Sequence, residues 1–195
     1  MEPSDFYTGL VAELYESLIG HPPSSDRYAA LVAESGEPAL ELACGSGLPL
    51  IDLVGRGLDV VGLDASADML ERARRKAEAR GLRVELHRGL MQDFDLGRAF
   101  RTVFVGNGSF TLLTSDADAL ATLRAARRHL LPDGSLWLDL EVADPEPFRR
   151  TIGRFRETVE DGHTLRCGVT AVEVSPDGRD LAITLRYERR GPDGS

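Results

Sequence analysis

The residues best suited to chemistry are two acids and a pair of glycines. Glu41 lies inside the apolar run 39–43, which ends at Gly45-Ser46-Gly47. Glycines at the end of a strand let the backbone approach a ligand closely, because no side chain occupies the space. Asp64 ends a second apolar run nineteen residues after Gly45. A carboxylate at that place can accept hydrogen bonds from both hydroxyls of a ribose, although it can also be a simple strand-end cap.

The same segment discriminates between nucleotide cofactors. A dinucleotide-binding fingerprint needs a third glycine at position 50, where this chain has Leu50. A carboxylate in a central strand needs a partner, because burying an unpaired charge is costly. A cationic ligand would be such a partner for Glu41, whereas a pyrophosphate would be repelled. These features favour S-adenosylmethionine, which has a ribose diol, an α-ammonium, a sulfonium and no phosphate.

The elements that must position these residues alternate between apolar runs and amphipathic stretches from Ala39 to Glu141. This alternation is typical of a parallel sheet built from βαβ units. The intervening helices are indicated by helical spacing and by cap residues such as Ser66 and Ser115. A further helix is predicted over 5–18. The predicted strands are 39–43, 58–63, 82–87, 100–105 and 135–140, with Pro132-Asp133-Gly134 ending the helix before the last.

The pattern changes after Pro147. Asp161-Gly162 and Pro176-Asp177-Gly178 are hairpin signals that separate three segments of alternating apolar residues. The predicted fold is therefore α/β: a Rossmann-like doubly wound parallel sheet with helices on both faces, and an appended antiparallel β-meander. We expect a domain over 1–147, including the N-terminal helix as a lid, and a meander over 148–195 on the acceptor side.

The sequence resembles the class I S-adenosylmethionine-dependent methyltransferases. The matching segments are 40–47, 61–70, 89–94 and 130–134, and the resemblance covers roughly 15–140. Within the family the chain is similar to enzymes of the small-molecule subgroup, which includes sugar-amine N-methyltransferases. The resemblance implies an enzyme that transfers a methyl group to a nitrogen or oxygen of a small-molecule acceptor by in-line displacement.

The resemblance also implies roles for individual residues. Glu41 and the backbone of the glycine loop would hold the methionine end of the cofactor, and Asp64 the ribose. Tyr15 would close over the cofactor, and Asn107 would lie between cofactor and acceptor. The cofactor-binding set implied is Tyr15, Glu41, Ala43, Gly45, Ser46, Gly47, Asp64, Ala65, Met69, Leu90, Met91, Gln92 and Asn107.

Two departures from the family pattern stand out. Leu90 occupies the position where the family usually has an acid that reads the adenine amine, so Asp93 or a backbone carbonyl would have to replace it. The hairpin that usually completes the sheet is not found after Arg190. We expect that the chain is truncated, with cover of the sheet edge by a second copy or by the meander as alternatives. No catalytic residue is assigned: Asp139 and Glu141 are the nearest acids by topology, but they fit solvated strand ends as well.

The composition limits the classes of partner that we expect. The chain has 195 residues and a net charge of −9, which disfavours a nucleic-acid partner because phosphate binding relies on clustered Lys and Arg. Cysteines and histidines lack metal-ligand spacing, so no metal is expected. There is no secretory signal and no stretch of about 18 apolar residues, so we expect a cytoplasmic protein without membrane contact. An NAD(P)-dependent oxidoreductase and a non-catalytic S-adenosylmethionine-binding protein remain the alternatives.

Overall fold

The computed structural model describes residues 6–19, 24–142, 144–160 and 162–191. The chain divides into two compact units. The first consists of residues 1–8 and 22–141, and the second of residues 9–21 and 142–195. The domain division proposed from the sequence, 1–147 and 148–195, remains a prediction.

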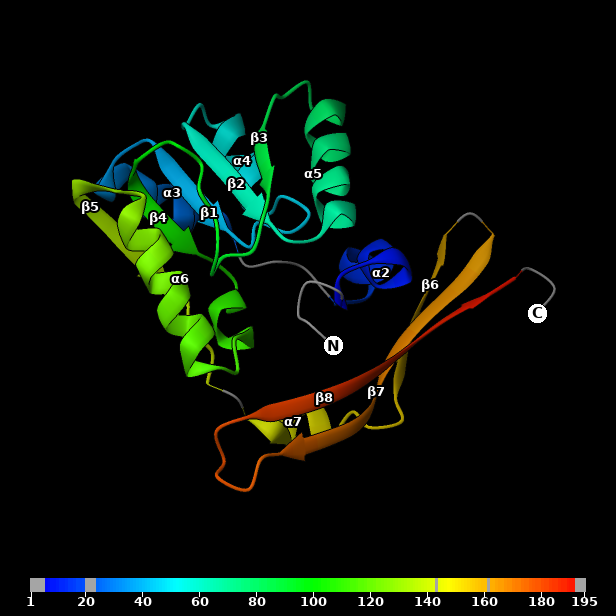
Figure 1. The fold of residues 1–195 in the computed structure, drawn as a ribbon. Coiled ribbons are helices and arrows are strands. Elements are labelled where there is room, and N and C mark those ends of the chain that lie inside the picture. Colours follow the sequence, from blue (N-terminus) through cyan, green and yellow to red (C-terminus); the bar gives the residue numbers. More distant parts are fainter. Residues whose placement is uncertain (1–5, 20–23, 143, 161, 192–195) are drawn as a thin grey trace. The chain divides into compact units, whose positions relative to one another are not determined.

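The first unit is built on a parallel sheet of five strands in the order β3-β2-β1-β4-β5 (Figure 1). Its strands are β1 (Ala39–Leu42), β2 (Val60–Asp64), β3 (Glu85–Arg88), β4 (Phe100–Val105) and β5 (Leu130–Leu138). The predicted doubly wound fold class is confirmed. In the described part of the chain, β5 has β4 on one side and no strand on the other.

The start of β5 corrects one prediction. The segment Pro132-Asp133-Gly134 lies inside β5 rather than before it, because β5 begins at Leu130 directly after the preceding helix. The pairing of β5 with β4 shifts register between Phe100 and Thr102. Proline lacks an N–H donor and is accepted in sheets at edge strands and bulges, which is where Pro132 is found.

Two helices of the first unit begin at a serine whose side chain caps them. Ser66 Oγ accepts the Met69 N–H at the start of α5 (Ala67–Ala79), and Ser115 Oγ accepts N–H groups at the start of α6 (Asp116–Arg128). Both caps were predicted. A short helix α4 (Leu50–Gly55) follows β1, and a 3-10 turn η1 (Ser109–Leu112) follows β4. Helix α3 (Asp26–Ser35) was not predicted.

The sheet is covered on both faces. Leu40 and Leu42 of β1 pack in one cluster with Ala125 and Ala126 of α6. The opposite face, to which Ala39 points, packs against α3, α4 and α5 in a second cluster. Because side chains alternate along a strand, Glu41 shares the face of Ala39. The chain passes to opposite faces after β1 and after β4, so the carboxyl ends of these strands form a topological switch point, where open α/β sheets bind their ligands.

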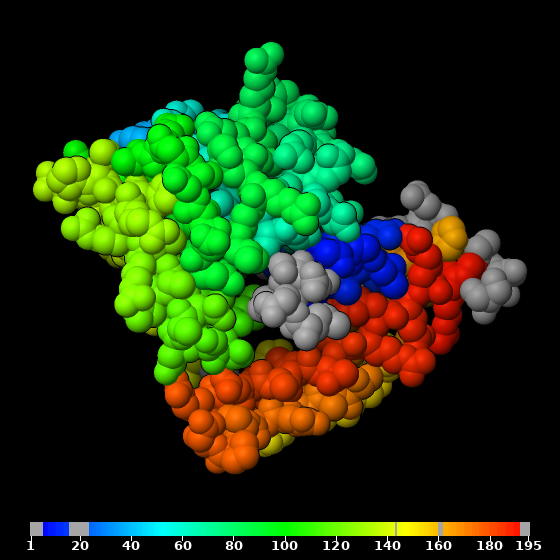
Figure 2. All heavy atoms as spheres, in the orientation of Figure 1, coloured from blue at the N-terminus to red at the C-terminus, as the bar shows by residue number. Residues whose placement is uncertain are grey.

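The second unit is a three-stranded antiparallel sheet in the order β6-β7-β8, with helices α2 (Gly9–Ile19) and α7 (Pro145–Arg149). Its strands are β6 (Phe155–Glu160), β7 (His163–Val174) and β8 (Leu181–Arg190), so the predicted meander is confirmed. Leu14 of α2 packs with Leu165 and Cys167 of β7 in a small core. In Figure 2 the blue atoms of α2 lie against the red atoms of β8, where Glu13 pairs with Arg189.

Over the described residues, none of the helices combines the length and the apolar character that crossing a membrane requires.

Candidate functional site

The loop after β1 exposes its backbone at one glycine and packs closely at another. Gly45 and Gly47 both have positive φ values, 55° and 90°. A Cβ on Gly47 would lie 2.6 Å from Ile51 Cδ1 and 3.1 Å from Ala73 Cβ, so that glycine is needed for packing. A Cβ on Gly45 would meet only Met69 Cε, at 3.4 Å. The space over Gly45 is therefore bordered only by the end of the flexible Met69 side chain, which leaves more room for a ligand than at Gly47.

Asp64 is fixed beside this loop by two backbone donors. The Gly45 N–H donates to Oδ2 and the Ser66 N–H donates to Oδ1, each at 2.8 Å. Burial raises the pKa of the Asp64 carboxyl, and these two hydrogen bonds oppose the increase. Each carboxylate oxygen has a second lone pair, so both can still accept a hydroxyl. The geometry leaves Asp64 able to hold a diol.

Glu41 is a buried acid with one oxygen unused. The residue is 1% exposed, and among the described residues its Oε2 has no hydrogen-bond partner. Burial, and then the charge of Asp64, raise the pKa of Glu41 well above its ordinary 4.5, while the Leu50 N–H opposes this. An unsatisfied buried carboxylate is costly, and a cation next to it removes much of the cost. The carboxylates of Glu41 and Asp64 therefore fit S-adenosylmethionine, which brings a cation, a diol and no phosphate.

The structure brings most of the predicted residues to the ends of β1 and β2. Glu41, Ala43, Gly45, Ser46 and Gly47 lie on β1 or its loop, and Asp64, Ala65 and Met69 lie at the end of β2 and the start of α5. Ala43 adopts a φ of 56°, in the left-handed region that favours glycine.

The loop after β3 starts at the same edge. The Gly89 N–H donates to Asp64 O at 3.0 Å, and the Asp93 N–H closes a turn onto Leu90 O at 3.1 Å. Leu90 is 42% exposed, whereas Met91 packs against the core. Gln92 is half-buried in this turn. Tyr15 lies on α2 in the second unit, and its role remains a prediction.

Two side chains that the sequence reasoning did not single out reach this region. Lys76 of α5 donates from Nζ to Ser46 O at 3.3 Å and to Ser46 Oγ at 3.0 Å. Burial lowers the pKa of Lys76 to about 8. Its position seven residues after Met69, on the same helix face, is a signal that could have identified it. Tyr28 of α3 contacts both Asn107 and Asp139.

Comparisons with known proteins agree with this geometry. A family profile described as "Methyltransferase domain" matches residues 39–134. The dTDP-3-amino-3,6-dideoxy-alpha-D-glucopyranose N,N-dimethyltransferase of Streptomyces fradiae is 35% identical over 206 residues, covering 98% of this chain and 75% of the relative. The cypemycin N-terminal methyltransferase of a Streptomyces species is 33% identical, covering 77% of this chain, which spans about half of that relative (54%).

A solved structure extends the similarity to the whole fold. The CcbJ methyltransferase of Streptomyces caelestis is 26% identical, with a TM-score of 0.69 over 97% of this chain and 77% of that chain. The predicted family and the predicted cofactor are confirmed by these relationships. The chain belongs to the class I S-adenosylmethionine-dependent methyltransferases.

Proposed function

We propose that the protein transfers the methyl group of S-adenosylmethionine to an amine nitrogen of a small molecule, and that the acceptor is an amino sugar. The observation that carries the cofactor side is the buried Oε2 of Glu41, which has no hydrogen-bond partner in the described part of the chain and lies in the electrostatic range of Asp64, the residue that binds the Gly45 N–H. The acceptor class is supported by the similarity to the Streptomyces fradiae amino-sugar N,N-dimethyltransferase, which spans 98% of this chain.

The proposal gives each predicted residue a role. Glu41 and the backbone of 43–47 hold the methionine end, and Asp64 holds the ribose hydroxyls. Tyr15 closes over the cofactor, and Asn107 lies toward the acceptor. The residues around the adenine are Ala65, Met69, Leu90, Met91 and Gln92.

The protein does not have to supply a nucleophile for this reaction. When bound, the cofactor supplies a methyl group already activated on a sulfonium. The residues of the chain have to hold the acceptor nitrogen about 3–3.5 Å from that carbon, in line and away from water, which can contribute about 7–11 kcal/mol. Asp139 is not assigned as a base, because its Oδ2 already accepts hydrogen bonds from Tyr28 and Asn107.

Calorimetric titration and a transfer assay test the proposal. S-adenosylmethionine and S-adenosylhomocysteine are expected to bind and NADH to give no heat, whereas NADH binding alone would favour an oxidoreductase. The protein is then incubated with S-adenosylmethionine and either a nucleotide-linked amino sugar or a peptide with a free N-terminus. Mass spectrometry should find methyl groups on the sugar amine. Methylation of the peptide alone would refute the sugar acceptor, and cofactor binding without transfer to either would favour a non-catalytic protein.

Two predictions about the whole protein accompany the proposal. A homodimer would place a second copy against the open edge of β5, and sedimentation at several concentrations would detect it. The cytoplasmic location also stays a prediction, which cell fractionation can test.

A further inference from the structure

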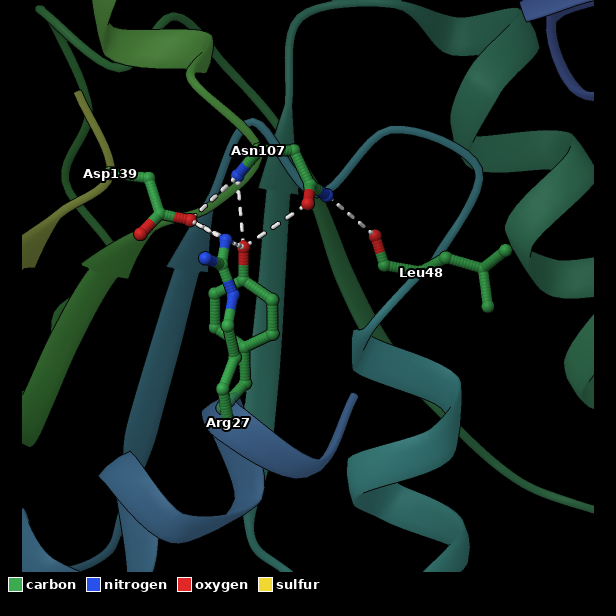
Figure 3. A network of polar contacts seen from close by, with 5 residues as sticks. Arg27, Leu48, Asn107 and Asp139 are labelled. Carbon is green, nitrogen blue, oxygen red and sulfur yellow. Dashed lines mark hydrogen bonds and ion pairs between the residues drawn. The ribbon is translucent and has the colours of Figure 1, made fainter. Parts of the chain in front are cut away.

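A chain of hydrogen bonds links the ends of three neighbouring strands (Figure 3). Asp139, directly after β5, accepts the Tyr28 hydroxyl at 2.5 Å. The Tyr28 hydroxyl lies 3.1 Å from Asn107 Oδ1 and accepts the Asn107 N–H at 3.0 Å. Asn107 Nδ2 in turn donates to Leu48 O at 3.3 Å. These hydrogen bonds therefore connect the end of β5, across the end of β4, to the loop that follows β1.

Asn107 is held from several sides in an uncommon conformation. Its φ of 54° lies in the left-handed region, where asparagine is enriched among non-glycine residues. Its N–H is shared between the Tyr28 hydroxyl and Asp139 Oδ2, each at 3.0 Å. Such a conformation persists when the surrounding contacts fix it. Here the fixing contacts come from residues 79 and 32 positions away in the sequence.

Tyr28 is itself rigidly placed. The residue is 2% exposed, and its ring stacks on Phe104 of β4 with centroids 5.5 Å apart. A Cβ on Gly106 would lie 2.9 Å from the Tyr28 hydroxyl, so this oxygen is close to the backbone of the segment that leads into Asn107. Arg27 donates to the hydroxyl at 2.5 Å and also pairs with Asp139. The hydroxyl therefore has a fixed position between α3, β4 and β5.

The two segments that these hydrogen bonds join lie on either side of the switch point. Leu48 leads into α4 on one face of the sheet, and Asn107 leads toward α6 on the other. The hydrogen bonds of Asn107 therefore tie the segment after β4 both to Tyr28 and to the loop before α4. We propose that Tyr28 and Asp139 are positioning residues that hold Asn107 against the glycine loop and so set the geometry in which methyl donor and acceptor meet.

The inference rests on the proposed function, but its first consequence does not need an acceptor. If Tyr28 fixes Asn107, loss of the hydroxyl loosens the segments around Leu48 and Asn107 in the cofactor-free protein. In the active enzyme, a displacement of about 1 Å in a positioned group can cost about 100-fold in rate. Tyr28 and Asp139 are therefore expected to affect kcat far more than the KM for S-adenosylmethionine.

The experiment uses Tyr28→Phe, which keeps the ring and its stacking on Phe104 and removes only the hydroxyl. Hydrogen exchange by mass spectrometry is measured on the cofactor-free protein for peptides covering 43–49 and 106–112. We expect faster exchange in both segments. In the transfer assay, kcat should fall about 10- to 100-fold while the KM for S-adenosylmethionine changes less than about threefold.

Thr102→Val is the matched control. Thr102 is buried near the amino end of β4, the strand that leads to Asn107. Its Oγ1 donates to Gly36 O at 2.6 Å. This variant also removes one buried hydroxyl, but it should leave exchange in 43–49 and 106–112 unchanged and kcat within about twofold. If Tyr28→Phe behaves like this control, the positioning role is refuted.

A second variant protects the test against a folding defect. Asn107→Gly accepts the positive φ easily and loses the side-chain contacts to Tyr28 and Leu48. If Tyr28 acts through Asn107, the double variant should have a kcat no lower than that of the more impaired single variant; multiplied losses would overturn the proposal. Faster exchange in Tyr28→Phe, with no methyl transfer by the unmodified protein, would instead contradict the proposed function and leave the positioning role standing.

Discussion

The two acids of the site differ in what they do for the protein without its cofactor. Asp64 accepts two backbone N–H groups, whereas one oxygen of Glu41 is buried without a partner among the described residues. Glu41 is thus a position where binding is favoured over stability. The sequence predicted both acids because their spacing from Gly45 is a local pattern. Tyr28 and Asp139 could not be linked in this way, because they are 111 positions apart and meet only in the folded sheet.

Replacing Glu41 with Gln should stabilise the cofactor-free protein at neutral pH. The pKa of Glu41 is raised well above 4.5 in the folded state, so the folded protein holds this proton more tightly than the unfolded chain. The stability that Glu41 contributes is therefore complete below its unfolded pKa and is lost as pH rises through the folded value. Urea denaturation should show Glu41→Gln more stable by about 1–3 kcal/mol at neutral pH, with the difference vanishing near pH 4.5.

Glu41→Gln should at the same time bind S-adenosylmethionine more weakly, because the neutral amide cannot neutralise the cofactor's charge. A variant that is both more stable and equally tight in binding would contradict the role assigned to Glu41.

Asp64→Asn should weaken binding of S-adenosylmethionine by about 1.5–3 kcal/mol, or roughly 10- to 100-fold, because it removes charge-assisted acceptors from the ribose hydroxyls. The amide keeps only one acceptor oxygen, so either the Gly45 N–H or the Ser66 N–H also loses its partner, and part of the loss in affinity comes through the glycine loop. Calorimetry gives the affinity, and Asp68→Asn, an exposed acid four residues further on, is the control. Equal affinities for the two variants would remove Asp64 from the ribose site.

At the scale of elements, local patterns predicted those parts whose signals are local. Ser66 and Ser115 cap helices as expected, since a cap bonds to residues only two or three positions away. The start of β5 was missed because Pro132 indicates a break, yet a strand at the edge of the sheet tolerates it. Helix α3 was missed because its two fully buried residues, Tyr28 and Val32, give too few apolar positions for a clear helical period.

His129 joins two elements of the first unit and offers a test of their packing. Its Nδ1 lies 2.8 Å from Ala125 O, and its Nε2 lies 3.1 Å from the Leu96 N. A carbonyl only accepts, so Nδ1 carries the proton and Nε2 accepts the Leu96 N–H. His129→Leu keeps the apolar contact with Phe94 but leaves the Leu96 N–H and the Ala125 carbonyl without this partner. Chemical denaturation should show a loss of about 1–3 kcal/mol.

The control for His129→Leu is His87→Leu, because His87 is more exposed and pairs with Glu85, which also lies at the surface. Its cost should stay within about 0.5 kcal/mol. If both substitutions have the same small effect, His129 does not connect α6 to the loop that precedes β4.

At the scale of the whole molecule, the change of periodicity after Pro147 was sufficient to predict a parallel sheet followed by a meander. Periodicity does not show which element a helix packs against. Leu14 of α2 packs on Leu165 and Cys167, in a core that is assembled from the two ends of the chain. Each unit has a hydrophobic core of its own. The single tryptophan, Trp137, lies on β5 and so reports on the first unit alone.

The response of each unit to S-adenosylmethionine can therefore be measured separately. A ligand at 100 times its Kd stabilises the native state by about 2.7 kcal/mol, so the unfolding midpoint followed by Trp137 fluorescence should rise. If Tyr15 closes over the cofactor as proposed, the cofactor should also slow hydrogen exchange in α2 and β7 of the second unit. Tyr15→Ala should abolish this slowing while the Trp137 midpoint still rises. Slowed exchange that persists in Tyr15→Ala would mean that another residue carries the coupling, and unchanged exchange in the unmodified protein would leave Tyr15 without a part in binding.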